Sequence, residues 1–166
     1  MNFEQKQKSF RELYKENHLH LEKYCRSLIR DEEQCKEMMS ETIAIAYEQF
    51  EKIRDLSKFK QFLFGISANL FKKYLRNKGK HVEMETISNR PADTEPFHKT
   101  DSDFLYECLS KLNPPQGEII ALFELSGFKL QEIAEMKSIP LSTVKTHLYR
   151  GKEALRTLIL QTEKTF

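Results

Sequence analysis

The sequence has few of the residues that an all-β protein needs for tight turns. It contains 5 glycines and 5 prolines in 166 residues, and these two residue types supply many of the backbone conformations of β-turns. It also lacks any run of about 18 consecutive apolar residues, the length that indicates a membrane helix. Its charged first residues cannot form the apolar stretch of a signal peptide. We therefore expect a helical, soluble and cytoplasmic protein without membrane insertion.

Cysteine and histidine are too few and too scattered to form a recognisable metal site. The three cysteines, Cys25, Cys35 and Cys108, include no Cys-x-x-Cys pair and cannot all pair with one another. His18 and His20 are two residues apart, which separates them by about 200° around a helix, and the other histidines have no cysteine partners. We therefore expect buried thiols, no disulfide framework, no metal and no cofactor.

Charge is balanced overall but changes along the chain. The 27 basic and 25 acidic residues give a net charge of +2, which does not identify a partner. Residues 1–78 carry an excess of four positive charges, residues 79–102 an excess of two negative charges, and residues 103–166 no excess. The middle segment contains two prolines, a turn-like Asn-Arg-Pro-Ala-Asp run and no helical apolar stripe. We predict an all-α protein of two small helical domains, residues 1–78 and 103–166, joined by a flexible linker.

The first domain shows the periodicity of amphipathic helices almost throughout. A break near Asn17 divides its first apolar stripe into two expected helices. The clearest amphipathic helix follows, with Asp31 as its N-cap and apolar residues three or four positions apart up to Phe50. Its first turns are acidic from Asp31 to Glu41. These acids either suit the positive end of the helix or face a basic partner, and both interpretations stay open.

A further apolar stripe predicts a helix that begins near Phe59 and ends in a basic run. Five cations and no acid occur within nine residues: Lys72, Lys73, Arg76, Lys78 and Lys80. Phosphate is their natural counter-charge, although a basic helix end also complements the helix dipole. We expect Phe62, Phe64 and Asn69 to be exposed nearby, where flat side chains can stack on unpaired bases. Core packing is the alternative for Phe62.

The second domain contains the pattern of a helix-turn-helix. A helix pair separated by two prolines precedes a short helix, a tight connection at residues 137–140 and a longer helix. The small side chain of Ala134 lies where the last two helices must approach closely. Polar and basic residues mark the outward face of the longer helix: Ser142, Thr143, Lys145, Thr146, Tyr149, Arg150 and Lys152. Such side chains bind base edges and phosphates in the major groove, so we predict DNA binding, with a solvent-facing helix pair as the alternative.

These residues resemble a known family. The motifs that carry the resemblance most clearly are EIAEM and IPLSTVKTHLYRGKEALR. Residues 112–159, which contain them, closely resemble conserved region 4 of bacterial RNA polymerase sigma factors of the extracytoplasmic-function (ECF) group. Residues 13–76 resemble region 2 of the same group. The two matches stand in the family's order, without the long middle domain of larger sigma factors, and cover nearly the whole chain.

The resemblance implies a non-catalytic polymerase subunit with three binding surfaces. The helix from Asp31 to Phe50 would bind the coiled-coil clamp of the largest subunit of core RNA polymerase through Glu37, Met38, Ser40, Glu41 and Thr42. The loop at residues 50–58 would capture a flipped base of the minus-ten promoter element, and the melted strand would meet Phe62, Phe64, Asn69, Lys72, Lys73 and Arg76. The minus-thirty-five element would be bound by Ser142, Thr143, Lys145, Thr146, Tyr149 and Arg150. Core polymerase, promoter DNA and an anti-sigma factor are the implied partners.

Several positions depart from the family pattern. Ser40 stands where glutamine is usual, and Phe62 where tryptophan is common. Lys129 replaces the usual serine cap of the first helix of the helix-turn-helix, a loss of about 1 kcal/mol unless Ser126 compensates. Ser138 stands in a turn that is usually Leu-Gly, and serine tolerates a positive φ poorly. We therefore expect a strained or differently shaped turn there.

Other classes of protein remain as alternatives. The strongest is a transcription regulator that uses only the helix-turn-helix, with the first domain as an oligomerisation or ligand module, and that binds duplex DNA without polymerase. A nuclease needs carboxylates clustered in a pocket, which the acids at residues 31–33 do not establish. A pure scaffold leaves the outward face of the last helix without a role.

Overall fold

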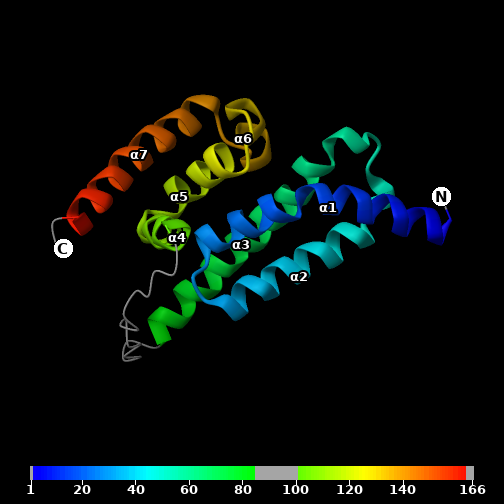
Figure 1. Ribbon diagram of the computed structural model, residues 1–166, viewed down its shortest axis with the longest axis horizontal. Helices are drawn as coiled ribbons and strands as arrows, with labels where there is room; N and C mark the ends of the chain where they lie inside the picture. Colours follow the sequence, from blue (N-terminus) through cyan, green and yellow to red (C-terminus); the bar gives the residue numbers. More distant parts are fainter. Residues whose placement is uncertain (1, 85–100, 164–166) are drawn as a thin grey trace.

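The computed structural model describes residues 2–84 and 101–163, and these residues are helical apart from short connections (Figure 1). This confirms the predicted all-α class with a helix-turn-helix in its second region. The first region comprises α1 (Phe3–Leu28), α2 (Glu32–Glu48), the short 3-10 turns η1 (Phe50–Lys52) and η2 (Leu56–Lys58), and α3 (Phe59–Met84). The second comprises α4 (Asp101–Lys111), α5 (Pro114–Ile120), the π-helical η3 (Ala121–Leu125), α6 (Leu130–Lys137) and α7 (Leu141–Glu163).

Helix α1 is one continuous helix, so the expected break near Asn17 is wrong. Its start is fixed by a capping box, in which Asn2 accepts from the backbone of Gln5 at 2.8 Å while the Gln5 side chain accepts from the Asn2 backbone. Asn17 does not interrupt the helix because its side-chain amide donates to the carbonyl of Leu13 at 2.8 Å, one turn back. A polar residue that bonds within its own helix leaves the backbone ladder intact.

An aromatic cluster joins the beginning of α1 to the connection between α2 and α3. The ring of Phe10 meets those of Tyr47, Phe50 and Phe59 edge to face, with centroids 5.3 to 5.7 Å apart. Edge-to-face contacts of this kind add about 0.5–1.5 kcal/mol each beyond the area they bury. The cluster therefore holds the segment between α2 and α3 by both of its ends, at Phe50 and Phe59.

Helices α3 and α4 extend beyond the domain bounds that the sequence predicted. Helix α3 includes residues 79–84, and α4 begins at Asp101, so both helices extend into the segment that the sequence predicted as linker. The rest of that segment, residues 85–100, lies outside the described residues, as do the side chains of Lys80 and His81.

The helix-turn-helix depends on two unusual backbone positions. Gly127 has a φ of 76°, and Ser138 ends α6 with a φ of 54° in the left-handed region, which confirms the expected strained turn. At the start of α6, Ser126 does not replace the missing serine cap, because its hydroxyl is buried without a hydrogen-bond partner. Glu132 supplies the reciprocal half of a capping box: its carboxylate accepts from the backbone amide of Lys129 at 2.9 Å.

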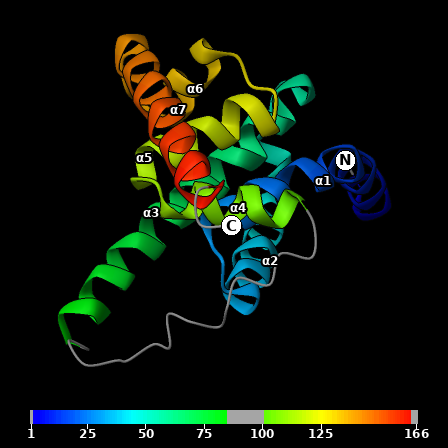
Figure 2. The ribbon, with the colours of Figure 1, turned by 60° about the vertical axis from the view of Figure 1, so that its left-hand side comes forward.

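The two regions pack against each other through α1 and α3. In Figures 1 and 2, α4 to α7 gather on one side of α1 and α3, and α2 lies on the other side. One apolar cluster includes Tyr24 and Phe64 of the first region together with Leu122, Phe128 and Ile133 of the second. The predicted domains therefore share a continuous core in this structure.

Candidate nucleic-acid interfaces

The helix-turn-helix is held by small and branched apolar residues. Ile133 and Ala134 of α6 and Val144 of α7 are buried at the crossing. The turn between the helices is closed by the backbone amide of Ile139, which donates to the carbonyl of Ala134 at 3.1 Å. Because the crossing is apolar and tightly connected, the opposite face of α7 is left to solvent.

That outward face carries the residues predicted to contact the minus-thirty-five element. Five of them are exposed, and Thr143 is half-buried; the exposed ones are Ser142, Lys145, Thr146, Tyr149 and Arg150. Tyr149 is 69% exposed, a large aromatic surface for which the fold provides no cover. The structure thus brings all six predicted residues together along the first half of α7.

Lys152 behaves differently from its neighbours on α7. Its Nζ lies 2.7 Å from a carboxylate oxygen of Glu124 and 5.5 Å from the centre of the Phe123 ring. Both partners belong to the π-helical η3, which ties Lys152 back to the body of the second region. The sequence pattern predicts Lys152 on the DNA-facing side of α7, whereas in the structure it has a local partner.

The basic end of α3 forms a second exposed face. Asn69, Lys72, Lys73 and Arg76 are all exposed. Among the residues that the structure describes, no carboxylate forms an ion pair with any of these three cations. Their charges are therefore available to an external anion such as a phosphate.

Phe64 is not exposed, contrary to expectation, and Phe62 is half-buried. The Phe64 ring is fully buried between Tyr24, 5.4 Å away, and Phe128 of the second region, 5.0 Å away. Phe62 packs beside Phe59 at 6.4 Å, which agrees with the core-packing alternative. Phe64 cannot stack on a base while the two regions are packed together, because Phe128 covers it.

The connection between α2 and α3 has a rim of mostly exposed residues above two buried aromatic side chains. Phe50 and Phe59 are buried at its ends, and the residues between them are mostly exposed. Asp55 accepts from the backbone amide of Ser57 at 3.0 Å and from its hydroxyl at 2.7 Å. These hydrogen bonds hold the pKa of Asp55 below its ordinary value. The rim is thus a locally ordered loop that offers Lys52, Arg54 and Lys58 to solvent.

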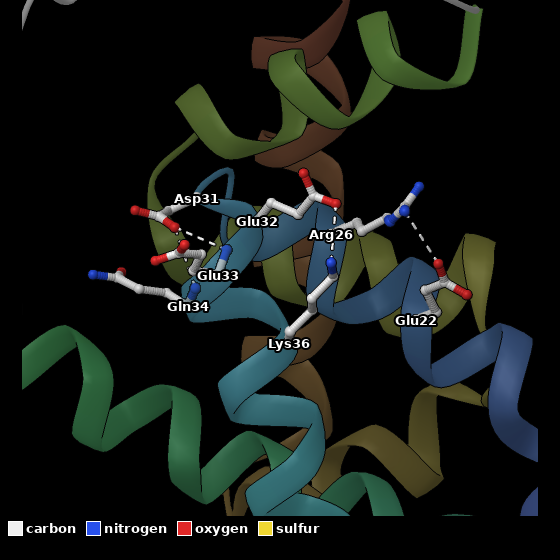
Figure 3. Close-up of polar contacts among 7 residues, drawn as sticks. All are labelled: Glu22, Arg26, Asp31, Glu32, Glu33, Gln34 and Lys36. Atoms are coloured by element: carbon white, nitrogen blue, oxygen red, sulfur yellow. Dashed lines mark hydrogen bonds and ion pairs between the residues drawn. The ribbon is translucent and has the colours of Figure 1, made fainter.

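Helix α2 provides an acidic face, whose first turn is explained by capping. Asp31 accepts from the backbone amides of Glu33 at 3.0 Å and of Gln34 at 3.2 Å, as Figure 3 shows. Glu32 pairs with Lys36 at 3.4 Å. Asp31 and Glu32 therefore have roles within the helix.

Of the five residues predicted to bind polymerase, three are exposed. Glu37, Ser40 and Glu41 are exposed, whereas Met38 and Thr42 are buried. The hydroxyl of Thr42 donates to the carbonyl of Met38 at 2.7 Å, inside the helix. An expected contact through Met38 or Thr42 is therefore not available in this structure. Both side chains face α1 and α3 because they occupy the apolar stripe.

The packing of the two regions adds residues that the sequence did not identify. Lys60 Nζ of α3 donates to the carbonyl of Ser126 and lies 4.8 Å from the centre of the Phe128 ring. His20 Nδ1 of α1 lies 3.3 Å from the same carbonyl. Burial lowers the pKa of Lys60. No sequence signal marks this contact, because Lys60 and Ser126 are far apart along the chain.

A buried acid lies at the same boundary. Glu118 of α5 is 3% exposed and pairs with Lys137 of α6. Burial raises the pKa of Glu118, although Lys137 acts in the opposite direction. Tyr24 of α1, which is fully buried, has a pKa raised first by burial and then by Glu118. Tyr24 belongs to the first region and the Glu118–Lys137 pair to the second, so these polar groups lie at the boundary between the two regions.

Two kinds of site can be excluded for the part of the chain that the structure describes. No helix there is long and apolar enough to cross a membrane. Over the same residues, no three or more side chains of histidine, cysteine, aspartate or glutamate are placed to hold a metal ion.

The exposed face of a helix-turn-helix, together with separate basic and acidic helical faces, defines a DNA-binding protein of two regions with no catalytic constellation among the described residues. Comparisons with known proteins are specific. Residues 13–81 match the model of sigma-70 region 2, and residues 104–155 match that of sigma-70 region 4. The sigma factor SigV of Bacillus subtilis is 30% identical over 132 residues, which cover 78% of each chain.

Two further relatives are also sigma factors. An ECF sigma-E factor of Haemophilus influenzae is 25% identical over 138 residues, covering 74% of this chain and 73% of the relative. The solved structure of the sigma factor RpoE of Bartonella quintana, in complex with the anti-sigma factor NepR, has a TM-score of 0.74 at 22% identity and covers 89% of this chain and 96% of its own. The chain belongs to the ECF sigma factors and contains their regions 2 and 4. It directs promoter recognition by RNA polymerase as a non-catalytic subunit.

Proposed function

We propose that three exposed faces divide the work of promoter recognition: α7 binds the minus-thirty-five element, α3 and the loop before it bind the minus-ten element, and α2 binds core polymerase. The observation that carries the proposal is the outward face of α7, where five exposed polar or basic residues lie together beside the half-buried Thr143. Residues 1–78 and 103–166 act as the two binding units, and the residues between them act as a linker.

The contact of α7 with DNA follows from its side chains. Arg150 and Lys145 can donate to guanine edges in the major groove. Ser142, Thr143, Thr146 and Tyr149 can bond backbone phosphates and so position the helix. A helix that enters the groove by its first half, as the exposed residues of α7 allow, leaves its second half packed on α4 and α5.

The basic face of α3 supports binding of an opened strand. Lys72, Lys73 and Arg76 bind phosphates, and Asn69 bonds a base or sugar. The loop at residues 50–58 holds a nucleobase that has left the stack, since the loop has a polar rim above rigidly packed aromatic side chains. Phe62 adds part of its ring, and Phe64 joins this surface only when the second region moves away. By binding the opened strand better than the duplex, the protein shifts the DNA toward the open state.

The acidic face of α2 supports binding of core polymerase. Glu37, Ser40 and Glu41 are exposed on successive turns and offer carboxylates and a hydroxyl to a basic coiled coil. A groove of about 520 Å³ separates this face from the basic end of α3, with Glu37 and Glu41 on one side and Lys73 and Lys78 on the other. On this proposal, the acidic side of the groove binds polymerase and its basic side binds DNA.

Regulation and location follow from the family. RpoE of Bartonella quintana was solved with an anti-sigma factor, and we infer that a protein of this class controls the present chain in the cytoplasm. The alternative function is a helix-turn-helix regulator that acts without joining polymerase. It would use α7 alone and leave the acidic face of α2 without a partner.

Transcription in vitro tests the proposal. Purified core polymerase is incubated with fragmented genomic DNA, with and without the chain, and start sites are mapped. We expect discrete new start sites that require the chain. Glu37→Lys reverses one exposed charge and should reduce polymerase association in a pull-down while leaving the helix content unchanged. The matched control is Glu16→Lys, an exposed acid of α1. Duplex binding without new start sites would favour the alternative regulator.

A further inference from the structure

The first two turns of α3 are covered by the second region. Lys60 and Gln61 are half-buried there, and Phe64 is fully buried. Each of these three residues has a partner in the segment from Ser126 to Glu135, which follows η3 and includes most of α6. Gln61 is eleven residues from Lys72, which is about three helical turns. The covered turns therefore lie in line with part of the basic face of α3.

Lys60 is bound at the C-terminal end of a helix of the other region. Its Nζ donates to the carbonyl of Ser126, which caps η3, and lies 3.4 Å from Nδ1 of His20. Among the described residues, no carboxylate forms an ion pair with Lys60. The C-terminal end of a helix carries a partial negative charge of about half an elementary charge. The carbonyl of Ser126 thus stands beside the ammonium group as a phosphate oxygen of a nucleic acid would.

An aromatic ring of the second region covers Phe64. The ring of Phe128 meets that of Phe64 edge to face, with centroids 5.0 Å apart, and its centre lies 4.8 Å from Nζ of Lys60. Phe128 follows Gly127, whose φ of 76° turns the chain away from η3. An unpaired base makes the same two kinds of contact, with an aromatic side chain and with a cation. The Phe128 ring therefore occupies a place that suits a base.

The third contact brings negative charge to α3. Nε2 of Gln61 lies 3.5 Å from Oε2 of Glu135, an exposed residue of α6. Glu132 of the same helix also acts on Lys60: burial lowers the pKa of this lysine, and the charge of Glu132 opposes that effect. The covering segment thus presents to α3 an aromatic ring, a carbonyl at a helix end and carboxylates. Single-stranded DNA presents bases and anionic oxygens.

We propose that the segment from Ser126 to Glu135 is an internal competitor of the opened promoter strand, which must displace it to reach Lys60, Gln61 and Phe64. The proposal rests on the strand-binding function of α3 proposed above and adds Lys60 and Gln61 to its contact residues. Because one surface cannot hold both occupants, a bound strand separates the regions and packed regions exclude the strand. Any change that weakens the internal contact therefore strengthens strand binding. The outward face of α7 is exposed in the packed chain and stays outside this competition.

A cross-link that holds the two regions together tests the competition. The ends of the Gln61 and Glu135 side chains meet, so a bismaleimide can join the thiols of a full chain that carries Gln61→Cys and Glu135→Cys. The matched control is the same double variant capped with N-ethylmaleimide. The three native cysteines are buried, and the wild-type chain treated with each reagent shows whether they react. Binding of a fluorescent oligothymidylate is measured by anisotropy, and binding of a duplex of the same length reports on α7.

We expect the cross-linked chain to bind the oligothymidylate at least about tenfold more weakly than the capped chain, because its competent fraction is small. Both forms should bind the duplex equally. Equal binding of the single strand by the two forms would overturn the competition alone. If neither form nor the wild-type chain bound the single strand, the strand-binding function of α3 would fail together with the competition.

Substitutions in the segment should act in the opposite direction. Phe128→Leu keeps an apolar side chain but removes the ring, so it should tighten oligothymidylate binding roughly tenfold. Phe123→Leu is the control, since Phe123 contacts Lys152 of α7. Circular dichroism shows that the helices remain. In the Phe128→Leu chain, Lys60→Gln should then weaken binding and reduce the salt slope by about 0.7. Unchanged affinity in Phe128→Leu would contradict the competition, and an unchanged slope would remove Lys60 from the contact residues.

Discussion

Ser138 ends α6 in a backbone conformation that glycine adopts more easily than serine. Its φ of 54° places it in the left-handed region, and its backbone amide still donates to the carbonyl of Glu135 at 3.3 Å. For residues with a Cβ atom this conformation costs about 1–2 kcal/mol. The turn of the helix-turn-helix therefore holds strain that a single substitution can relieve.

We expect Ser138→Gly to stabilise the protein by up to about 1 kcal/mol, since relief of the strain exceeds the added freedom of glycine in the unfolded chain. Urea denaturation measures the difference in the free energy of unfolding. Ser142→Gly on α7 is the matched control, because it lies in a helix and should destabilise by about 0.5–1 kcal/mol. A lower stability for Ser138→Gly would show that the serine side chain contributes more than its backbone costs.

Arg150 tests which residue of α7 determines sequence preference. If it donates to a guanine edge, Arg150→Ala should weaken promoter binding by about 1–3 kcal/mol and change the preferred sequence. Arg156→Ala is the control, since Arg156 lies further along α7 and is 72% exposed with only a weak contact to Glu153 at 3.9 Å. Binding is measured by fluorescence anisotropy on a panel of single-base variants. Equal weakening on every sequence would instead assign Arg150 to a phosphate.

At the scale of elements, the exposed end of α3 combines three cations that form no ion pair with a described carboxylate. Replacing Lys72, Lys73 and Arg76 by glutamine should make the slope of log affinity against log salt less steep, by about 0.7 per cation for a single strand and about 0.9 for duplex DNA. The matched variant replaces Lys8, Lys15 and Lys23, which are exposed on α1. Titrations at several salt concentrations compare the two. The same slope for both variants would place the DNA elsewhere.

The helices were predictable where the apolar periodicity is strong. They were less predictable where hydrogen bonds of polar side chains determine whether a helix continues or begins. The apolar stripe of α2 and the pattern of α6 and α7 follow directly from residue spacing. The continuity of α1 through Asn17 does not, because it depends on a hydrogen bond from that side chain to Leu13. The start of α6 shows the same limit: the sequence shows that Lys129 lacks the side chain of a good N-cap, but the geometry is needed to show that Glu132 bonds the amide of Lys129.

At the scale of the molecule, the packing of the two regions was not predictable. Phe64 lies on a helix face that the sequence left open, and the ring that covers it, Phe128, comes from the other region. Lys60 likewise finds its acceptor, the carbonyl of Ser126, across the boundary. Residue spacing carries no information about contacts between segments so far apart, so the α7 face could be anticipated while the state of Phe64 could not.

If α7 and α3 bind the two promoter elements as proposed, the packed arrangement must open for both elements to be bound at once. A compact chain of this length has a radius of gyration of about 15 Å. Elements centred near positions minus ten and minus thirty-five are separated by roughly 25 base pairs, or about 85 Å of B-form DNA. On that proposal, the contact of Phe64 and Lys60 with the segment around Phe128 belongs to the free protein.

Removing the Phe128 ring should favour separation of the two regions. We expect Phe128→Ala to increase the radius of gyration in small-angle scattering and to speed proteolysis between residues 84 and 101. Phe123→Ala is the control, since this half-buried ring lies beside Lys152 of α7 rather than beside Phe64. Circular dichroism confirms that the helices remain. An unchanged radius with intact helices would show that other contacts, such as the hydrogen bond from Lys60 to the carbonyl of Ser126, hold the regions together.

The burial of Phe64 has a quantitative consequence for every ligand of the separated chain. If about 1% of molecules are separated at any moment, such a ligand shows an apparent affinity about a hundredfold weaker than its intrinsic one. A substitution that weakens the contacts between the two regions would raise the apparent affinity, even at a position that does not contact the ligand. Proteins that hold the regions apart and proteins that hold them together would then oppose each other through one conformational equilibrium, even where they share no contact residue.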